Sequence, residues 1–272
     1  MNRKYLCFLS GFVMALLNSF TANAQSQLSK TDSAEVIKKV LESSEKVNTV
    51  VYKIDHKKKG LSEKDTTYTT AICSLYIAPK DRLKAYHIVD KEYSSSYGKG
   101  FAYMRYDGKR AFYLSKLIDS LDVYRESYIA KGKRKLEQIV HNYNFLLLGK
   151  HFAFSRKSSG KGDSQGANVL ITEEMINNKT VYCITVNFKD NEDARNRVEK
   201  LYIGKSDYLP TGGSSFWQWE NMEEYEYYEV EYLAINPEIS LEEFKVDKNL
   251  TVNLAERYKV FKEKINNKES IN

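Results

Sequence analysis

Short runs of alternating apolar and polar residues, separated by polar turns, recur along most of this chain. The pattern is clearest from Phe101 to Tyr124, where aromatic and β-branched residues flank Asp107-Gly108. Such alternation is typical of half-buried strands, and an Asp-Gly pair favours a hairpin turn in which both central residues take positive φ. Comparable runs along the chain predict about ten to twelve strands in a large, curved antiparallel sheet.

Three segments instead carry apolar residues at helical spacing. The predicted helices are Thr31–Val47 with Thr31-Asp32 at the N-cap, Lys133–Leu148 ending at Gly149, and a terminal helix marked by Leu254, Tyr258, Phe261 and Ile265. Asn266 to Asn272 should fray at the C-terminus. We therefore expect a mainly β fold with a few helices.

One predicted strand, Thr66 to Ala78, is apolar on both faces. Ile72 and Tyr76 alternate with Ala71, Cys73, Leu75 and Ile77. A strand that is apolar on both sides needs cover on each face, or else one face is apolar because it binds something. The sequence leaves open whether these residues form a packed core or line a cavity.

The first 24 residues have the features of a cleaved export signal. A basic start (Arg3, Lys4) precedes an apolar run from Leu6 to Phe20, and Ala22-Asn23-Ala24 is a small-residue cleavage site. Cys7 is placed too early to be a lipid-attachment cysteine. We predict a leader over 1–24, a main domain over 25–248 and a C-terminal helix and tail over 249–272, in a periplasmic or secreted protein with no transmembrane segment in the mature chain.

Composition limits the choice of partners. The 272 residues include 21 Tyr and carry a net charge of +6, of which Arg3 and Lys4 in the leader supply two. Lysines cluster in turns, as at Lys57-Lys58-Lys59, where solvation is the simplest explanation, so no nucleic-acid partner is expected. An oxidising compartment permits a bridge between Cys73 and Cys183, although both also suit a strand interior as apolar residues.

Motifs for catalysis or metal binding are sparse. The four histidines, His56, His87, His141 and His151, lie singly without ligand-spaced partners. There is no Gly-x-Ser-x-Gly elbow, and the glycines of the Ser155–Ala167 loop do not follow a strand into a helix as a phosphate loop would. We predict no enzyme activity, no catalytic residues, no metal and no cofactor.

The aromatic and aliphatic strand residues are the stronger signal. A curved sheet with a concave face lined by Tyr, Phe and Ile could hold an acyl chain. The candidate ligand-binding residues, each in an alternating strand beside apolar neighbours, are Tyr52, Ile54, Tyr86, Tyr103, Phe112 and Tyr228.

Two stretches carry a resemblance to a known family. Leu75–Ile88 and the Tyr106–Tyr113 hairpin, followed later by Leu201–Gly204 and Tyr208–Pro210, resemble the LolA-like superfamily of periplasmic lipoprotein-sorting and carrier proteins. The later half is also similar to N-terminal extensions of some exported thioredoxin-family disulfide reductases. The resemblance implies an unclosed antiparallel half-barrel with helices covering the concave face, which binds acyl chains or lipoproteins.

The family's carriers close their lid through an arginine contact, which in this chain either Arg82 or Arg105 could provide. In the reductases a redox domain follows the resembling segment, whereas here a short helix is expected after it, and the sequence has no Cys-x-x-Cys motif. The leading hypothesis is an exported, non-enzymatic carrier or binding protein for a lipid or lipoprotein acyl chain. The alternative is a protein-interaction domain of an envelope complex, possibly a thiol-redox one; a hydrolase would need a clustered acid/base pair.

Overall fold

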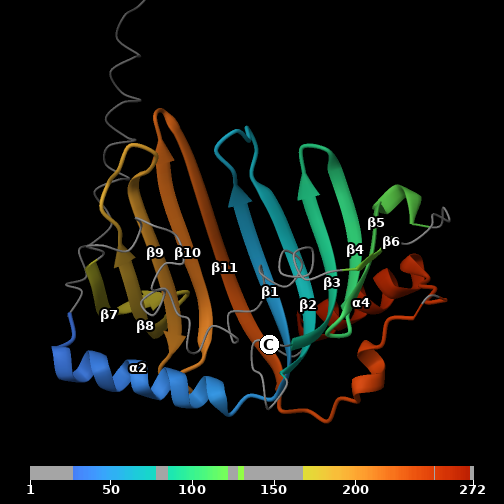
Figure 1. The fold of residues 1–272 in the computed structure, drawn as a ribbon, viewed down its shortest axis with the longest axis horizontal. Coiled ribbons are helices and arrows are strands. Elements are labelled where there is room, and N and C mark those ends of the chain that lie inside the picture. The colour runs from blue at the N-terminus through green and yellow to red at the C-terminus, as the bar shows by residue number, and fades with distance from the viewer. Residues whose placement is uncertain (1–26, 78–84, 122–127, 132–167, 248, 270–272) are drawn as a thin grey trace, which may run out of the picture.

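A computed structural model describes residues 27–77, 85–121, 128–131, 168–247 and 249–269 of the chain. These residues form an 11-stranded sheet with helices packed on it (Figure 1). The strands are β1 (Thr49–Lys59), β2 (Thr67–Ile77), β3 (Ala85–Ser95), β4 (Gly98–Tyr106), β5 (Arg110–Leu117), β6 (Tyr128–Lys131), β7 (Asn168–Ile176), β8 (Lys179–Asn187), β9 (Arg195–Gly204), β10 (Pro210–Trp219) and β11 (Met222–Ile235).

The sheet consists of two antiparallel meanders joined at its centre. The strand order is β6-β5-β4-β3-β2-β1-β11-β10-β9-β8-β7, so the first and last strands of the chain order pair with each other. Strands β6 and β7 lie at the two edges, and the sheet is not closed into a barrel. The predicted mainly β, antiparallel and unclosed architecture is therefore confirmed.

The turns show where local sequence was interpreted correctly and where it was not. At Asp107-Gly108 only Gly108 has a positive φ, of 82°, so the expected turn with two positive φ values is wrong. Instead the Asp107 carboxylate accepts hydrogen bonds from the backbone N–H groups of Lys109 and Arg110, and this side chain closes the loop. The turn with two positive φ values occurs at Asn177-Asn178, between β7 and β8.

The two long helices of the described residues are α2 (Lys30–Glu45) and α4 (Leu254–Glu269), and two short 3-10 helices are η1 (Ile118–Ser120) and η3 (Leu241–Phe244). Both long helices were predicted. The N-cap of α2 is Ser29, whose hydroxyl accepts from the Asp32 N–H, and not Thr31-Asp32. Helix α4 continues to Glu269, beyond the predicted fraying point at Asn266.

Several predictions fall on residues outside the described ranges. These are the leader over 1–24, the helix over Lys133–Leu148, the loop over Ser155–Ala167, and the residues His141, His151 and Arg82. The domain boundaries at 25–248 and 249–272 also stay predictions.

Each long helix covers a different face of the sheet, and we name the faces accordingly. Helix α2 packs Val36 and Val40 against apolar side chains of β7, β8 and β9. The cross-strand registers carry this face, the α2 face, through Leu201, Gly213 and Tyr228 to His56 of β1. It is therefore one continuous surface across both meanders.

Helix α4 lies on the opposite face, the α4 face, over β3 and β4 (Figure 1). Phe261 of α4 contacts Phe101 with ring centroids 5.3 Å apart, and Phe244 of η3 contacts Tyr86 at 6.2 Å. Arg257 of α4 pairs with Asp90 of β3 through Nε–Oδ1 at 2.5 Å and Nη2–Oδ2 at 2.8 Å. The C-terminal helix is thus held by aromatic packing and by a bidentate ion pair.

The two-faced character of β2 is real. Ile72 belongs to the cluster under α4, whereas Ala71, Cys73 and Leu75 belong to a separate cluster on the α2 face. Cys73 and Cys183 are both buried and free, on opposite faces, so the permitted bridge does not form. None of the helices in the described ranges combines the length and apolarity that a membrane crossing requires.

Candidate functional site

The six predicted ligand-binding residues divide between the two faces. Tyr52, Ile54 and Tyr228 lie on the α2 face, in one apolar cluster. Tyr86, Tyr103 and Phe112 lie on the α4 face, in another. The sheet separates the two groups, so the six residues cannot line a single cavity.

The three residues on the α4 face are packed by the chain itself. Tyr103 and Phe112 are fully buried, with ring centroids 5.8 Å apart. The Arg257 guanidinium lies 3.9 Å from the centre of the Tyr103 ring, and Arg105 donates from Nε to the Tyr103 hydroxyl. Tyr86 packs edge-on against Tyr76 at 5.7 Å. These contacts give the residues a structural role beneath η3 and α4.

Arg105, one of the two arginines considered for a lid contact, belongs to the same face. Besides Tyr103, it donates from Nη1 to the backbone carbonyl of Lys245 at 3.2 Å. It therefore holds the segment that follows η3 against the sheet.

The α2 face carries a broad apolar cluster at the centre of the sheet. One cross-strand row runs from Tyr232 through Tyr52, Cys73 and Val89 to Met104, and thus spans β11, β1, β2, β3 and β4. Residues directly opposite each other in such a row share a face and contact their neighbours. Of the described helices, α2 lies over β7–β9 and α4 on the other face, so neither packs on this row.

Two tyrosines lie flat on this face because glycines leave room for them. A Cβ on Gly100 would lie 2.3 Å from the Tyr93 ring, and a Cβ on Gly213 would lie 2.6 Å from the Tyr228 hydroxyl oxygen. The Tyr93 hydroxyl is 2.9 Å from Ser115 Oγ. Both rings therefore extend along the sheet and widen the apolar surface on either side of the central rows.

A lysine interrupts this apolar surface. Lys91 of β3 lies in register between Ala71 and Ala102, directly beside the central row. Its Nζ is 5.9 Å from the centre of the Tyr93 ring. Burial lowers the pKa of Lys91, and no carboxylate of the described residues forms an ion pair with it. Lys91 is thus a cation at the edge of an apolar surface, without a counter-ion in the described part of the chain.

Beyond Lys91 the α2 face becomes polar toward the ends of β1 and β11. His56 Nε2 lies 2.9 Å from Glu226 Oε1, and Lys58 Nζ lies 3.8 Å from Glu224 Oε1. The face therefore changes along the strands from apolar rows, through Lys91, to polar side chains that pair across β1 and β11.

Two further titratable groups are buried on this face. Burial raises the pKa of the Cys73 thiol to about 12 and lowers the pKa of His87 to about 4. His87 packs against Tyr106, with ring centroids 5.9 Å apart. A neutral imidazole and a protonated thiol keep this part of the face uncharged, and His87 is a buried residue of the sheet.

The alternation in the sequence predicts a strand over Arg82–Asp90, which ends one residue before Lys91, so Lys91 was not selected as a candidate. The signal was nonetheless present: β3 alternates His87, Val89, Lys91 and Tyr93 on one face, so a lysine occupies an inward position. A strand extended to Ser95 would have revealed it.

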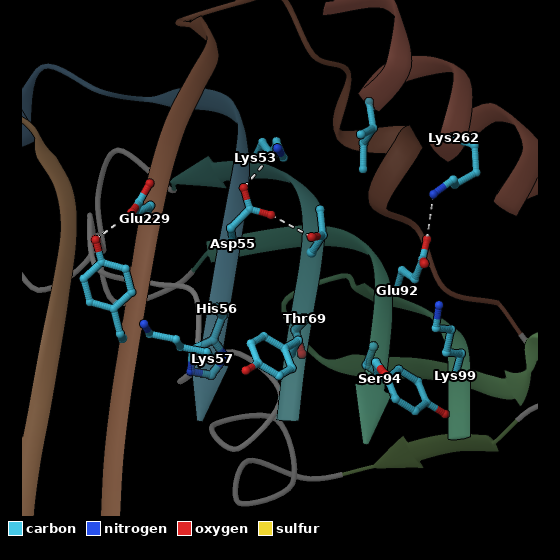
Figure 2. A pocket seen from close by; sticks show the side chains of 15 residues that line it. Lys53, Asp55, His56, Lys57, Thr69, Glu92, Ser94, Lys99, Glu229 and Lys262 are labelled. Atoms are coloured by element: carbon cyan, nitrogen blue, oxygen red, sulfur yellow. Dashed lines mark hydrogen bonds and ion pairs between the residues drawn. The ribbon is translucent and has the colours of Figure 1, made fainter. Parts of the chain in front are cut away.

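A second region of the molecule is hollowed and polar. A groove of about 520 Å³ lies on the α4 face, between the far ends of β11, β1, β2, β3 and β4 and the last turns of α4 (Figure 2). Lysines, carboxylates and tyrosines line it together, and Lys262 of α4 reaches across to Glu92 of β3 at 3.2 Å. Within the described ranges, no group of His, Cys, Asp and Glu side chains is arranged to hold a metal ion.

Comparisons with known proteins bear on the fold alone. No protein-family profile and no curated protein sequence matches this chain. Among solved structures it is similar to MucB (TM-score 0.37, 10% identity, 82% of this chain and 66% of MucB) and to the Mycobacterium tuberculosis lipoprotein LppX (TM-score 0.35, 10% identity, 78% of this chain and 100% of LppX).

A putative outer membrane lipoprotein-sorting protein domain from Vibrio parahaemolyticus is also among these structures, with a TM-score of 0.28, 10% identity, and 78% of this chain and 95% of that domain covered. At TM-scores of 0.28 to 0.37 and 10% identity, these similarities carry no argument about the family or function of the chain. The function has to be derived from this chain's own residues.

Proposed function

We propose that this chain is an exported, non-enzymatic binding protein that carries an acyl chain with an anionic head group on the α2 face. The observation that supports this most is the position of Lys91, a cation without a carboxylate partner among the described residues, beside a cluster that is otherwise apolar. The acyl chain would lie along the rows of Tyr52 and Cys73, and the head group would lie at Lys91.

The energetics favour such a ligand. Burying a methylene group contributes roughly 0.8 kcal/mol, so about ten methylenes supply about 8 kcal/mol before the losses of translational freedom and chain entropy. The row over β11, β1, β2, β3 and β4 is apolar. Its residues Tyr52, Cys73 and Val89 are each only 1% exposed, so the acyl chain would bind in place of the groups that now cover them. Because contacts of this kind are non-covalent, binding would be reversible, as a carrier requires.

The head group provides orientation. Burial disfavours the charged form of Lys91, and an anion beside it would restore the charge and raise the pKa of Lys91. Ser115 lies two strands away in the same row, with its hydroxyl close to Tyr93, and both can donate to a carboxylate or phosphate oxygen. An uncharged acyl ligand would not form the ion pair with Lys91.

Binding of a fluorescent fatty acid and of the matching fatty alcohol, both measured with the purified mature chain, tests the proposal. We expect the wild type to bind the acid more tightly than the alcohol. Lys91→Met should weaken binding of the acid about tenfold, which corresponds to about 1.4 kcal/mol, and leave binding of the alcohol unchanged. Lys116→Met is the matched control, because Lys116 is also a half-buried strand lysine but lies on the α4 face.

Absence of binding of both probes, together with no lipid extracted from the protein purified from its native envelope, would refute the acyl-carrier function. The interaction-domain alternative would then be the better hypothesis. Equal loss of both probes in Lys91→Met would refute only the assignment of the head group to Lys91.

A further inference from the structure

The polar groove on the α4 face has a regular construction. Its floor consists of two cross-strand rows (Figure 2). The first row is Glu229, Asp55, Thr70 and Glu92, and the second is Tyr227, Lys57, Tyr68, Ser94 and Lys99. Helix α4 closes the side at Glu92 through Lys262, and the rest of the groove is open to solvent.

The carboxylates of the first row are held by the protein. Asp55 accepts from the Thr70 hydroxyl at 2.6 Å and pairs with Lys53 at 2.9 Å. Glu229 accepts from the Tyr227 hydroxyl and from the side-chain amide of Asn177. Each carboxylate is therefore fixed in place, and each keeps lone pairs that can accept further hydrogen bonds from a ligand.

Two cations of the second row are not neutralised in this way. Lys57 lies over the Tyr227 ring, with Nζ 4.7 Å from its centre, and neither Lys57 nor Lys99 forms an ion pair with a carboxylate of the described residues. They lie three strands apart in one row, which is about 14 Å at the usual spacing of strands. Figure 2 shows them on opposite sides of the groove.

An exposed aromatic ring lies between the two lysines. Tyr68 is 58% exposed although it belongs to a strand in the middle of the sheet. Exposed tyrosines of this kind offer an apolar ring face with a polar tip, which suits flat ligands that are partly apolar and partly hydroxylated. The ring is in register with Lys57 on one side and with Ser94 on the other.

From these features we infer that the groove binds an elongated anionic saccharide. A sugar ring would stack on Tyr68, its hydroxyls would donate to the fixed carboxylates of Asp55 and Glu92, and its acidic groups would pair with Lys57 and Lys99. The spacing of the two lysines requires a ligand of more than one sugar unit.

The charges that line the groove argue against a densely charged anionic ligand. The lining residues include four lysines, Lys53, Lys57, Lys99 and Lys262, against three carboxylates, Asp55, Glu92 and Glu229. A dense polyanion such as nucleic acid would be repelled by the row of carboxylates. A ligand with separated charges and many hydroxyls fits both rows.

This site is independent of the proposed acyl site. The groove lies on the α4 face, and the apolar cluster with Lys91 lies on the α2 face, on the other side of the same sheet. A failure of either proposal therefore leaves the other unaffected.

Titration calorimetry of the mature chain with trigalacturonic acid and with a neutral galactose trisaccharide tests the inference. We expect binding of the acidic trisaccharide and no detectable binding of the neutral one. The double variant Lys57→Gln/Lys99→Gln and the single variant Tyr68→Ala should each weaken binding at least tenfold. Lys58→Gln, on the other face of β1, and Tyr97→Ala, a tyrosine that is 89% exposed in the β3–β4 turn, are matched controls and should change nothing.

Either of two results would overturn the inference. One is the absence of binding at millimolar trigalacturonic acid by a chain whose circular dichroism shows it to be folded. The other is binding that Lys57→Gln/Lys99→Gln leaves intact. Binding of anionic phospholipid vesicles that the double variant abolishes, in the absence of saccharide binding, would identify a lipid head group as the ligand and would also refute the saccharide.

Discussion

The ion pair between Arg257 and Asp90 sets a clear expectation for the docking of α4. The Asp90 side chain is 14% exposed and that of Arg257 is 30% exposed, so the pair is largely removed from water. Burial raises the pKa of the Asp90 carboxyl, and the charge and hydrogen bonds of Arg257 oppose that rise. Desolvation therefore outweighs the attraction, as is common for buried ion pairs.

Arg257→Met should destabilise the protein because it leaves the Asp90 carboxylate without its counter-ion. Removing one partner of a fully buried pair costs about 3–5 kcal/mol. Since Arg257 retains some contact with solvent, we expect a loss of about 2 kcal/mol at neutral pH. The apolar double variant Asp90→Leu/Arg257→Met should recover most of this loss.

The pH dependence follows from the sign of the shift. A carboxyl whose pKa is raised in the folded state favours folding when protonated, and this contribution is lost as the pH rises through the folded-state pKa. Without Arg257 the pKa of Asp90 should rise further. The difference in stability between Arg257→Met and the wild type should therefore shrink as the pH falls below neutrality.

Urea unfolding, followed by the fluorescence of Trp217 and Trp219 in β10, measures both effects. Lys262→Met is the control, because it removes a more exposed pair with Glu92 on the same helix and should cost less than about 1 kcal/mol. An Arg257→Met variant as stable as the wild type at neutral pH would refute the reasoning. So would a double variant that is less stable than Arg257→Met.

Three further outcomes are expected. Phe261→Ala should cost about 3–5 kcal/mol in urea unfolding, because Phe261 is fully buried against Phe101; a loss below about 1 kcal/mol would show that α4 contributes little to the stability. In the chain without residues 1–24, a thiol reagent at pH 8 should find no reactive cysteine in the native state and two in denaturant, because burial raises the pKa of Cys73 to about 12 and of Cys183 to about 11. Rapid labelling of Cys73 in the native state would contradict its burial. The pKa of His87 is lowered to about 4, so its contribution to stability is present above its unfolded pKa of about 6.5 and is lost as the pH falls toward 4. Between pH 7 and 4.5 the free energy of unfolding of the His87→Leu variant should therefore fall by about 2–3 kcal/mol less than that of the wild type. An unchanged pH profile would show that His87 does not titrate in this way.

The parts of the fold that could be predicted are those whose sequence signal lies within one strand or one helix. Alternation predicted the strand over Thr66–Ala78 and the hairpin around Asp107-Gly108, and helical spacing predicted α2 and α4. The conformations of the turns were predicted less reliably than the strands and helices. Asn177-Asn178 forms the turn with two positive φ values, whereas at Asp107-Gly108 the Asp107 side chain and its hydrogen bond from the Val246 N–H select another loop.

The candidate site was predicted only in part, for a physical reason. Alternation divides the residues of each strand into two sets, but it does not say which set of one strand faces the same way as a given set of the next. Tyr52 and Tyr86 therefore looked equivalent in the sequence, although the registers place them on opposite faces. Lys91 was missed for a related reason, since its meaning depends on Ala71 and Ala102 beside it.

Residue patterns alone are enough to predict a mainly β structure with one strand, β2, that is apolar on both sides and so requires two layers of contact. How those layers are used depends on the fold: α4 packs on one face through Phe261 and Arg257, and the other face carries the cluster around Tyr52 with Lys91 at its edge. The physical reason is that apolar character is a property of each residue, whereas burial, charge pairing and the sharing of a face depend on strand registers between residues far apart in the chain.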